Sequence, residues 1–274
     1  MSSGTLKAVE PLPLTLRLRA LHAPKEGNTE REYEDAFAAQ KLAPATVGSP
    51  SPTSFTVAVS DGASSSVFAR EWARLLVADF SLGPFPHSAG EAAARVATLG
   101  QTWREQVQNG ELPWYAEEKL TQGSHASLLV VTWDLTGRRT FFARALGDSC
   151  LFVVRGGERL CHAFPVTRAA DFGNHPRLLS TETAGTASSD APPPFVALDR
   201  PYEPGDRFFL MTDALAHWFL AAHEAGQKPW EILPLDRAAF PGWLQARRDD
   251  GSLKNDDVTL LVLSVLPATT AAPR

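Results

Sequence analysis

Three apolar runs in this chain meet aspartate at one end. The junctions are Asp61-Gly62 after residues 55–60, Asp213 after residues 207–212, and Asp256-Asp257 before residues 258–265. Short apolar runs bounded by polar residues predict buried strands, and side chains at strand ends project where backbone pairing stops. Carboxylates that converge in a buried place repel one another, so this pattern predicts a divalent cation that neutralises them. An Asp-Gly turn without a ligand is the alternative interpretation of residues 61–62.

The other hydrophobic patterns indicate both strands and helices. Apolar residues at alternate positions from Leu12 to Leu18 predict a strand with one buried face. Helical spacing predicts helices over residues 68–80, 92–107, 114–120, 215–222 and 236–248. Residues 127–133, 140–146 and 150–154 have short linkers and predict an antiparallel meander. Residues 165–204 have little periodicity and are expected to be a loop, with a mobile surface segment at 181–194.

Two largely antiparallel sheets stacked together, with helices on their outer faces, accommodate this order of elements better than a doubly wound parallel sheet. The expected fold class is therefore α+β, an α-β-β-α sandwich. A single domain over residues 12–265 is predicted, with residues 1–11 and 266–274 as tails.

Composition narrows the function. The chain has 274 residues, of which 44% are hydrophobic, and a net charge of -5. The chain has a pI near 5.8 and no run of basic residues, so it is not expected to bind nucleic acid. No basic leader and no apolar run of about 18 residues is present, so a cytoplasmic protein without a membrane partner is expected. Cys150 and Cys161 have neither zinc-site nor disulfide spacing and are expected to be buried free thiols.

Six short motifs, in order, resemble the type 2C family of metal-dependent Ser/Thr protein phosphatases. They are Tyr-Glu34-Asp35-Ala-Phe, Val-Ser-Asp61-Gly62, Gly123-Ser124-His125-Ala126, Leu-Gly147-Asp148-Ser149, Met-Thr-Asp213 and Asn-Asp256-Asp257-Val-Thr259. The resemblance covers about residues 12–265. It implies an α-β-β-α sandwich with two Mn²⁺ or Mg²⁺ ions at one end of the sheets, where a water that bridges the metals attacks a phosphoester.

The resemblance also implies roles for individual residues. Asp61 would bridge both ions, the Gly62 carbonyl would bind the first, and Asp213 and Asp256 would bind the second. Glu34 and Asp35 would hold metal-bound waters, and Asp148 matches the acid that bacterial members use for a third ion. Asp61, Asp213 and Asp256 are thus the predicted catalytic residues. Ligands that are all oxygen favour hard cations on chemical grounds as well.

The chain departs from the family pattern at several positions. Ala63 stands where eukaryotic members often have a general-acid histidine. The family's phosphate-binding arginine has no match here, because its position is occupied by Glu30. Arg17, Arg19 and Arg31 are the candidate substitutes, and Arg31 is the predicted phosphate-binding residue. Ser64 to Ser66 are interpreted as helix-capping residues, since no histidine follows in the context of a catalytic triad.

The leading hypothesis is a bacterial-like, monomeric phosphatase that hydrolyses phosphoserine and phosphothreonine in proteins, with a cognate kinase as a further partner. A pseudophosphatase that uses the sandwich as a binding module is the alternative from another class. A di-metal hydrolase of small phosphoesters would differ in substrate only. The three metal-binding acids favour an enzyme, whereas the unmatched arginine favours the binding module.

Overall fold

The computed structural model describes residues 14–41, 52–108, 122–173, 176–182 and 195–267. Two five-stranded sheets form the centre. The first sheet has the order β1-β12-β11-β7-β8 and the second has the order β10-β6-β5-β3-β2. Every pairing is antiparallel. The expected fold class is confirmed.

The first sheet is built from strands β1 (Leu14–Ala23), β7 (Cys150–Arg155), β8 (Arg159–Phe164), β11 (Arg207–Met211) and β12 (Val258–Pro267). The second is built from β2 (Ala36–Ala39), β3 (Ser54–Ser60), β5 (Leu128–Asp134), β6 (Thr140–Leu146) and β10 (Val196–Pro201). Two-residue strands β4 (His125–Ala126) and β9 (Leu179–Ser180) pair beside them.

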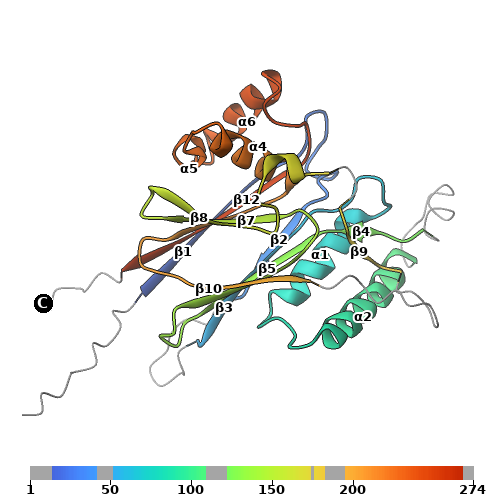
Figure 1. Ribbon diagram of the computed structural model, residues 1–274. Coiled ribbons are helices and arrows are strands. Elements are labelled where there is room, and N and C mark those ends of the chain that lie inside the picture. The colour runs from blue at the N-terminus through green and yellow to red at the C-terminus, as the bar shows by residue number, and fades with distance from the viewer. Residues whose placement is uncertain (1–13, 42–51, 109–121, 174–175, 183–194, 268–274) are drawn as a thin grey trace, which may run out of the picture.

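Helices cover the outer face of each sheet (Figure 1). The first sheet carries α4 (Asp213–Glu224), α5 (Pro229–Ile232) and α6 (Phe240–Asp249), whereas the second carries α1 (Ala69–Phe80) and α2 (Ala89–Gln108). A 3-10 turn, η1, spans Ala169–Asp171. The helix expected at 114–120 and most of the segment expected to be mobile lie outside the described residues.

Three apolar layers hold the sandwich together, because successive side chains of a strand point to opposite faces. In β11, Phe208 and Leu210 pack between the two sheets, whereas Phe209 and Met211 pack under α4. Both faces of the inner strands are therefore buried, which explains why their sequences are continuous apolar runs.

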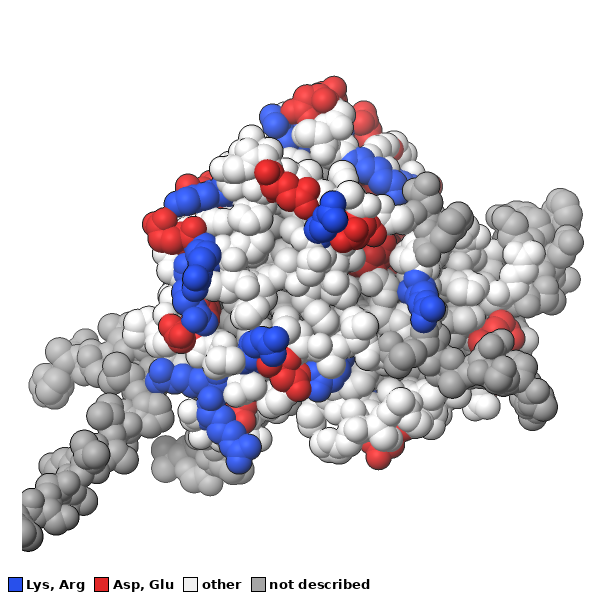
Figure 2. All heavy atoms as spheres, in the orientation of Figure 1, with Lys and Arg blue, Asp and Glu red and all other residues white. Residues whose placement is uncertain are grey.

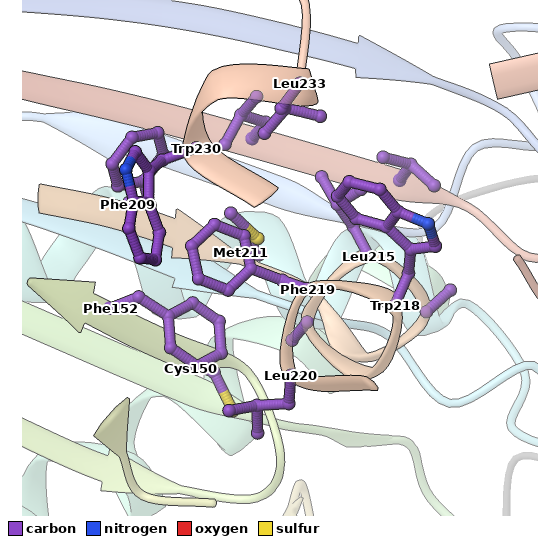
Figure 3. Close-up of a cluster of buried hydrophobic side chains, with 14 of the residues drawn as sticks. Cys150, Phe152, Phe209, Met211, Leu215, Trp218, Phe219, Leu220, Trp230 and Leu233 are labelled. Atoms are coloured by element: carbon purple, nitrogen blue, oxygen red, sulfur yellow. The ribbon is translucent and has the colours of Figure 1, made fainter. Parts of the chain in front are cut away.

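Aromatic rings join the first sheet to its helices (Figure 3). Phe152 of β7 stacks on Phe219 of α4 with ring centroids 4.5 Å apart and an angle of 15° between the planes. Phe219 also contacts Phe209 and Trp230. This contact fixes α4 on the sheet, and α4 begins at one of the predicted ligands, Asp213.

The predicted three-strand meander is wrong in one respect. Strands β5 and β6 pair as expected, but β7 belongs to the other sheet. Residues 147–149 carry the chain from one sheet to the other. Gly147 has φ +104°, and a Cβ there would lie 2.5 Å from the Cβ of Ser127, so this crossing requires glycine.

The expectation of a featureless loop at 165–204 is also wrong. Strand β10 lies within it and extends the second sheet by pairing with β6. Its side chains are mostly exposed, as suits an edge strand, and this explains why no apolar pattern revealed it. Thr181, the first residue of the expected mobile segment, is buried and accepts a hydrogen bond from the Ser124 amide.

Cys150 and Cys161 are free thiols as expected, but only Cys150 is buried. None of the described helices is long and apolar enough to cross a membrane. Lys and Arg side chains are scattered among Asp and Glu on the largely uncharged face seen in Figure 2.

Candidate metal centre

Asp61 follows β3 directly and is fixed through its backbone. Its amide donates to Ser127 Oγ (3.0 Å) and its carbonyl accepts from the Ser127 amide (2.8 Å). Gly62 forms an isolated bridge with Ala126. A Cβ on Gly62 would lie 2.8 Å from the carbonyl oxygen of Glu34, so only glycine allows these two segments to meet.

Asp35 comes to the same place from the neighbouring strand. Strand β2 pairs with β3 so that Ala36 lies opposite Ser60, which puts Asp35 beside Asp61. Asp35 Oδ2 accepts hydrogen bonds from Thr212 Oγ1 (2.9 Å) and Thr259 Oγ1 (2.8 Å). Its other oxygen, Oδ1, is buried without a hydrogen-bond partner among the described residues. A buried carboxylate oxygen that lacks a partner is costly, and it fits a water or cation bound there.

The first sheet contributes two more acids. Strand β11 ends one residue before Thr212, and Asp213 opens α4, where the partial positive charge of the helix N-terminus favours a carboxylate. Asp256 precedes β12 and is half-buried. The crossing between the sheets contributes Asp148, which is 8% exposed.

The electrostatics indicate that these acids act on one another. Burial raises the pKa of Asp61, and the negative charges of Asp35, Asp213, Asp148 and Asp256 raise it further. Burial, followed by the charge of Asp213, raises the pKa of Asp148 to about 6. Burial and the charge of Asp257 also raise the pKa of Asp35, against the stabilising hydrogen bonds from the two threonines. The fold therefore stores charge repulsion here, which a cation would relieve.

A pocket of about 360 Å³ opens beside these acids. Four carboxylates and one ammonium are among its lining groups: Asp61, Asp148, Asp213, Asp256 and Lys254. Lys254 Nζ lies 2.6 Å from Asp256 Oδ2 and 3.5 Å from Asp213 Oδ2. Partial burial opposes the charge of Lys254, but its hydrogen bond to Asp256 and the two negative charges outweigh burial and raise its pKa.

Asp257 does not line this pocket. It is buried, and its carboxylate accepts hydrogen bonds from the backbone amides of Lys25 (2.8 Å) and Glu34 (2.6 Å). It therefore holds residues 25–34 against the start of β12, and it orients the chain that enters Asp35.

Glu34 and Arg31 lie in a second pocket of about 380 Å³. Glu34 Oε2 accepts a hydrogen bond from Ser64 Oγ (2.7 Å) and lies 3.5 Å from Lys25 Nζ. Ser64 lines both pockets, so the two adjoin, but Arg31 lines only the second. The carbonyl of Arg31 accepts a hydrogen bond from the guanidinium of Arg70.

The capping role expected for Ser64 to Ser66 is wrong. Helix α1 begins at Ala69, and its N-cap residue is Phe68, which makes no capping hydrogen bond. Ser64 bonds Glu34, and Ser66 Oγ lies 3.3 Å from His125 Nδ1. The three serines instead belong to the loop before α1, in which Ser64 lines both pockets and Ser65 lines the acidic one.

The residues that support the acids could not be recognised from the sequence. Thr212 and Thr259 bind Asp35, and Tyr33 donates to Thr259 Oγ1. Lys25 and Lys254, which contact Glu34 and Asp256, were not predicted either. Lys254 stands two residues before Asp256 in the sequence, so its position was the available signal.

The described residues contain no group of three Asp, Glu, His or Cys side chains arranged to hold one metal ion. The donor set nevertheless fits a hard divalent cation. It consists of carboxylate oxygens from both sheets, the backbone approach that Gly62 permits, and the unpartnered Oδ1 of Asp35. The side chain of Lys254 stands between two of the acids in this conformation.

The fold and pocket define a class: four-layer sandwiches with an acidic site where the two sheets meet. A family model, Protein phosphatase 2C, matches residues 33–240, which is more than half of the chain. The chain belongs to the protein phosphatase 2C family. No curated protein is similar enough in sequence to be matched to it.

Solved structures of bacterial phosphatases have the same fold. The serine/threonine phosphatase PstP of Mycobacterium tuberculosis has 16% sequence identity and a TM-score of 0.54, with 92% of this chain and 99% of that chain covered. The PstP catalytic domain in complex with two manganese ions has 15% identity and a TM-score of 0.53, with the same coverage of 92% and 99%. PppA of Pseudomonas aeruginosa has 18% identity and a TM-score of 0.52, with 92% and 98% covered.

Proposed function

We propose that this chain is a Mn²⁺- or Mg²⁺-dependent phosphatase that hydrolyses phosphoserine and phosphothreonine in proteins. The observation that carries the proposal is the convergence of Asp61, Asp213 and Asp256, acids from both sheets, around one pocket. Asp35, whose charge acts on Asp61, adds a buried Oδ1 that has no hydrogen-bond partner among the described residues. The membership in the phosphatase 2C family supports it.

The charge of the pocket supports metal dependence. Among its lining groups are four carboxylates and one ammonium, so a phosphate monoester would meet net negative charge in the absence of cations. Bound cations would neutralise the phosphoryl group and lower the pKa of an attacking water. Asp61 and the Gly62 carbonyl would hold one ion, and Asp213 and Asp256 with Asp61 would hold the second.

The remaining acids have distinct proposed tasks. Asp35 offers its free Oδ1 to a water, and the Glu34 carboxylate, fixed by Ser64 and Lys25, would hold another. Asp148 would hold a third ion. Asp148 lies on the crossing between the sheets and lines the same pocket as Asp61, Asp213 and Asp256. Neither of the first two ions needs Asp148 as a ligand in this proposal.

Positive charge for the substrate phosphate would come from the second pocket. Arg31 remains the proposed phosphate contact, and Lys25 joins it, because Lys25 Nζ lies 3.4 Å from Ser64 Oγ, which lines both pockets. Ala63 carries no proton donor. We therefore propose that the leaving group is protonated by water.

The test is hydrolysis of an aryl phosphate and of phosphoserine and phosphothreonine peptides, with Mn²⁺, Mg²⁺ or chelator. Turnover that requires the metal and disappears in Asp61→Asn supports the phosphatase. Hydrolysis of the aryl phosphate but of neither peptide would point to small phosphoesters as substrates. Phosphorylated proteins as partners, a cognate kinase and a monomeric state belong to the same proposal.

A pseudophosphatase is the second candidate, and the Lys254 contact is the observation that favours it. An ammonium beside Asp213 and Asp256 neutralises the acids without a metal. Binding of a phosphopeptide without turnover under any metal would support this alternative and contradict the phosphatase.

A further inference from the structure

Lys254 is held in position by the chain around it. It lies between α6 and β12, and its neighbour Leu253 is buried, with an amide that donates to the Arg247 carbonyl (2.9 Å). The guanidinium of Arg248 donates to the carbonyls of Asp256 (2.8 Å) and Pro24 (3.1 Å). These hydrogen bonds hold the backbone on both sides of Lys254 in place, and the Lys254 side chain extends from this backbone to the acids.

The ammonium uses the same oxygens that a cation would need. Lys254 Nζ lies 2.6 Å from Asp256 Oδ2 and 3.5 Å from Asp213 Oδ2. Divalent cations bind carboxylate oxygens at roughly 2.0–2.6 Å, so an ion on Asp256 Oδ2 and an ammonium at hydrogen-bond distance would repel each other at close range. The side chain of Lys254 is 64% exposed, which leaves it room to swing out to solvent.

We propose that Lys254 is an intramolecular counter-ion that competes with the second divalent cation for Asp213 and Asp256. It weakens the binding of that ion and stabilises the two carboxylates when the ion is absent. This inference rests on the proposed function only in that Asp213 and Asp256 are taken as the ligands of the second ion.

Calorimetric titration of the metal-free full chain with MnCl₂ tests the competition without any measurement of turnover. We expect Lys254→Met to bind the weaker of two Mn²⁺ ions roughly tenfold more tightly, the scale of one charge-assisted hydrogen bond. Lys254→Arg keeps the charge and should bind Mn²⁺ like the wild type. In metal-free buffer, Lys254→Met should melt about 2–4 °C lower.

A matched control separates direct competition from general attraction of cations. Lys25 is a second ammonium near the acids, but it contacts Glu34 and Ser64 instead of Asp213 and Asp256. Lys25→Met should therefore change Mn²⁺ binding much less than Lys254→Met. In an Asp256→Asn background, Lys254→Met should no longer strengthen binding.

Unchanged or weaker Mn²⁺ binding in Lys254→Met would overturn the inference, as would equal gains in Lys25→Met or in Lys254→Arg. The absence of Mn²⁺ binding in both the wild type and Lys254→Met would also overturn it. A chain that binds Mn²⁺ as expected but hydrolyses no phosphoester would refute the proposed phosphatase and leave the role of Lys254 supported.

Discussion

Asp256 and Asp257 are adjacent in the chain, yet their carboxylates serve different parts of the molecule. Asp256 Oδ2 lies 2.6 Å from Lys254 Nζ in the acidic pocket, whereas Asp257 accepts the backbone amides of Lys25 and Glu34. Neighbouring side chains of an extended segment point to opposite sides, so one of them cannot take the place of the other.

The first prediction follows from this division. Asp256→Asn should reduce Mn²⁺-dependent turnover on the order of 100-fold or more, because a ligand of the second ion is weakened. Asp257→Asn should reduce turnover much less but cost about 1–3 kcal/mol of stability, since a buried acceptor of two amides loses its charge. Turnover, Mn²⁺ titration and urea unfolding of both variants measure this. A greater loss of turnover in Asp257→Asn than in Asp256→Asn would contradict the prediction and indicate that Asp257 is the metal ligand.

The second prediction concerns pH in the presence of chelator. The pKa of Asp148 is about 6 in the folded protein, above its ordinary value near 4, so the folded state binds the proton more tightly. Its contribution to stability is therefore complete below about pH 4 and is lost as the pH rises through about 6. Burial and neighbouring charges shift Asp35 and Asp61 in the same direction.

Urea unfolding of the metal-free chain between pH 5 and 7.5 measures this loss. Asp148→Asn should remove part of it, on the order of 2 kcal/mol. Saturating Mn²⁺ should reverse the slope, because carboxylates bind metal in their ionised form. Identical profiles for Asp148→Asn and the wild type would contradict the prediction.

The third prediction tests the contact at Gly62. Gly62→Ala would put a Cβ 2.8 Å from the Glu34 carbonyl oxygen and 2.9 Å from that of Ala69, so the segments must move apart. We expect a loss of about 1–3 kcal/mol in stability and weaker Mn²⁺ binding. Gly242→Ala in α6, where nothing lies within 4 Å, is the matched control and should be neutral or stabilising. Equal effects of the two variants would remove the steric argument.

The fourth prediction concerns the thiols. Burial raises the pKa of the Cys150 thiol, and its Sγ lies 3.1 Å from the Asp148 carbonyl. Only Cys161 should therefore react with a thiol reagent in the native protein, and Cys150 should react after unfolding. Reductant should leave the melting temperature unchanged, since both thiols are free. A reductant-dependent shift of the melting temperature would indicate a disulfide.

The buried helices and strands were the elements that could be predicted best from the sequence. Strand β12 could be located from its nearly continuous apolar run, and helix α4 from apolar residues at helical spacing. The exposed edge strand β10 has no such pattern and was missed. The transfer of β7 to the other sheet was missed as well, since the local sequence of a short turn does not determine which sheet the next strand joins.

The candidate site was predicted unevenly for a related reason. Asp61 and Asp213 each follow an apolar strand, and this position at a strand end is the signal that the sequence offers. The pairing of Lys254 with Asp213 is between residues 41 positions apart, and the hydrogen bonds from Thr212 and Thr259 to Asp35 span more than 170 positions. Such contacts depend on the completed fold. Arg31 is predicted from its place beside Glu30 in the sequence, but it lies in the adjoining pocket.

The passage of the chain from β6 to β7 has a mechanical consequence. Asp35 and Asp61 are attached to the second sheet, Asp213 and Asp256 to the first, and Asp148 to the short segment that joins them. An ion bound by acids of both sheets would cross-link the two halves of the sandwich at this end. Loading the centre would then slow amide hydrogen exchange at the ends of β3 and β11 together, although these strands share no hydrogen bond.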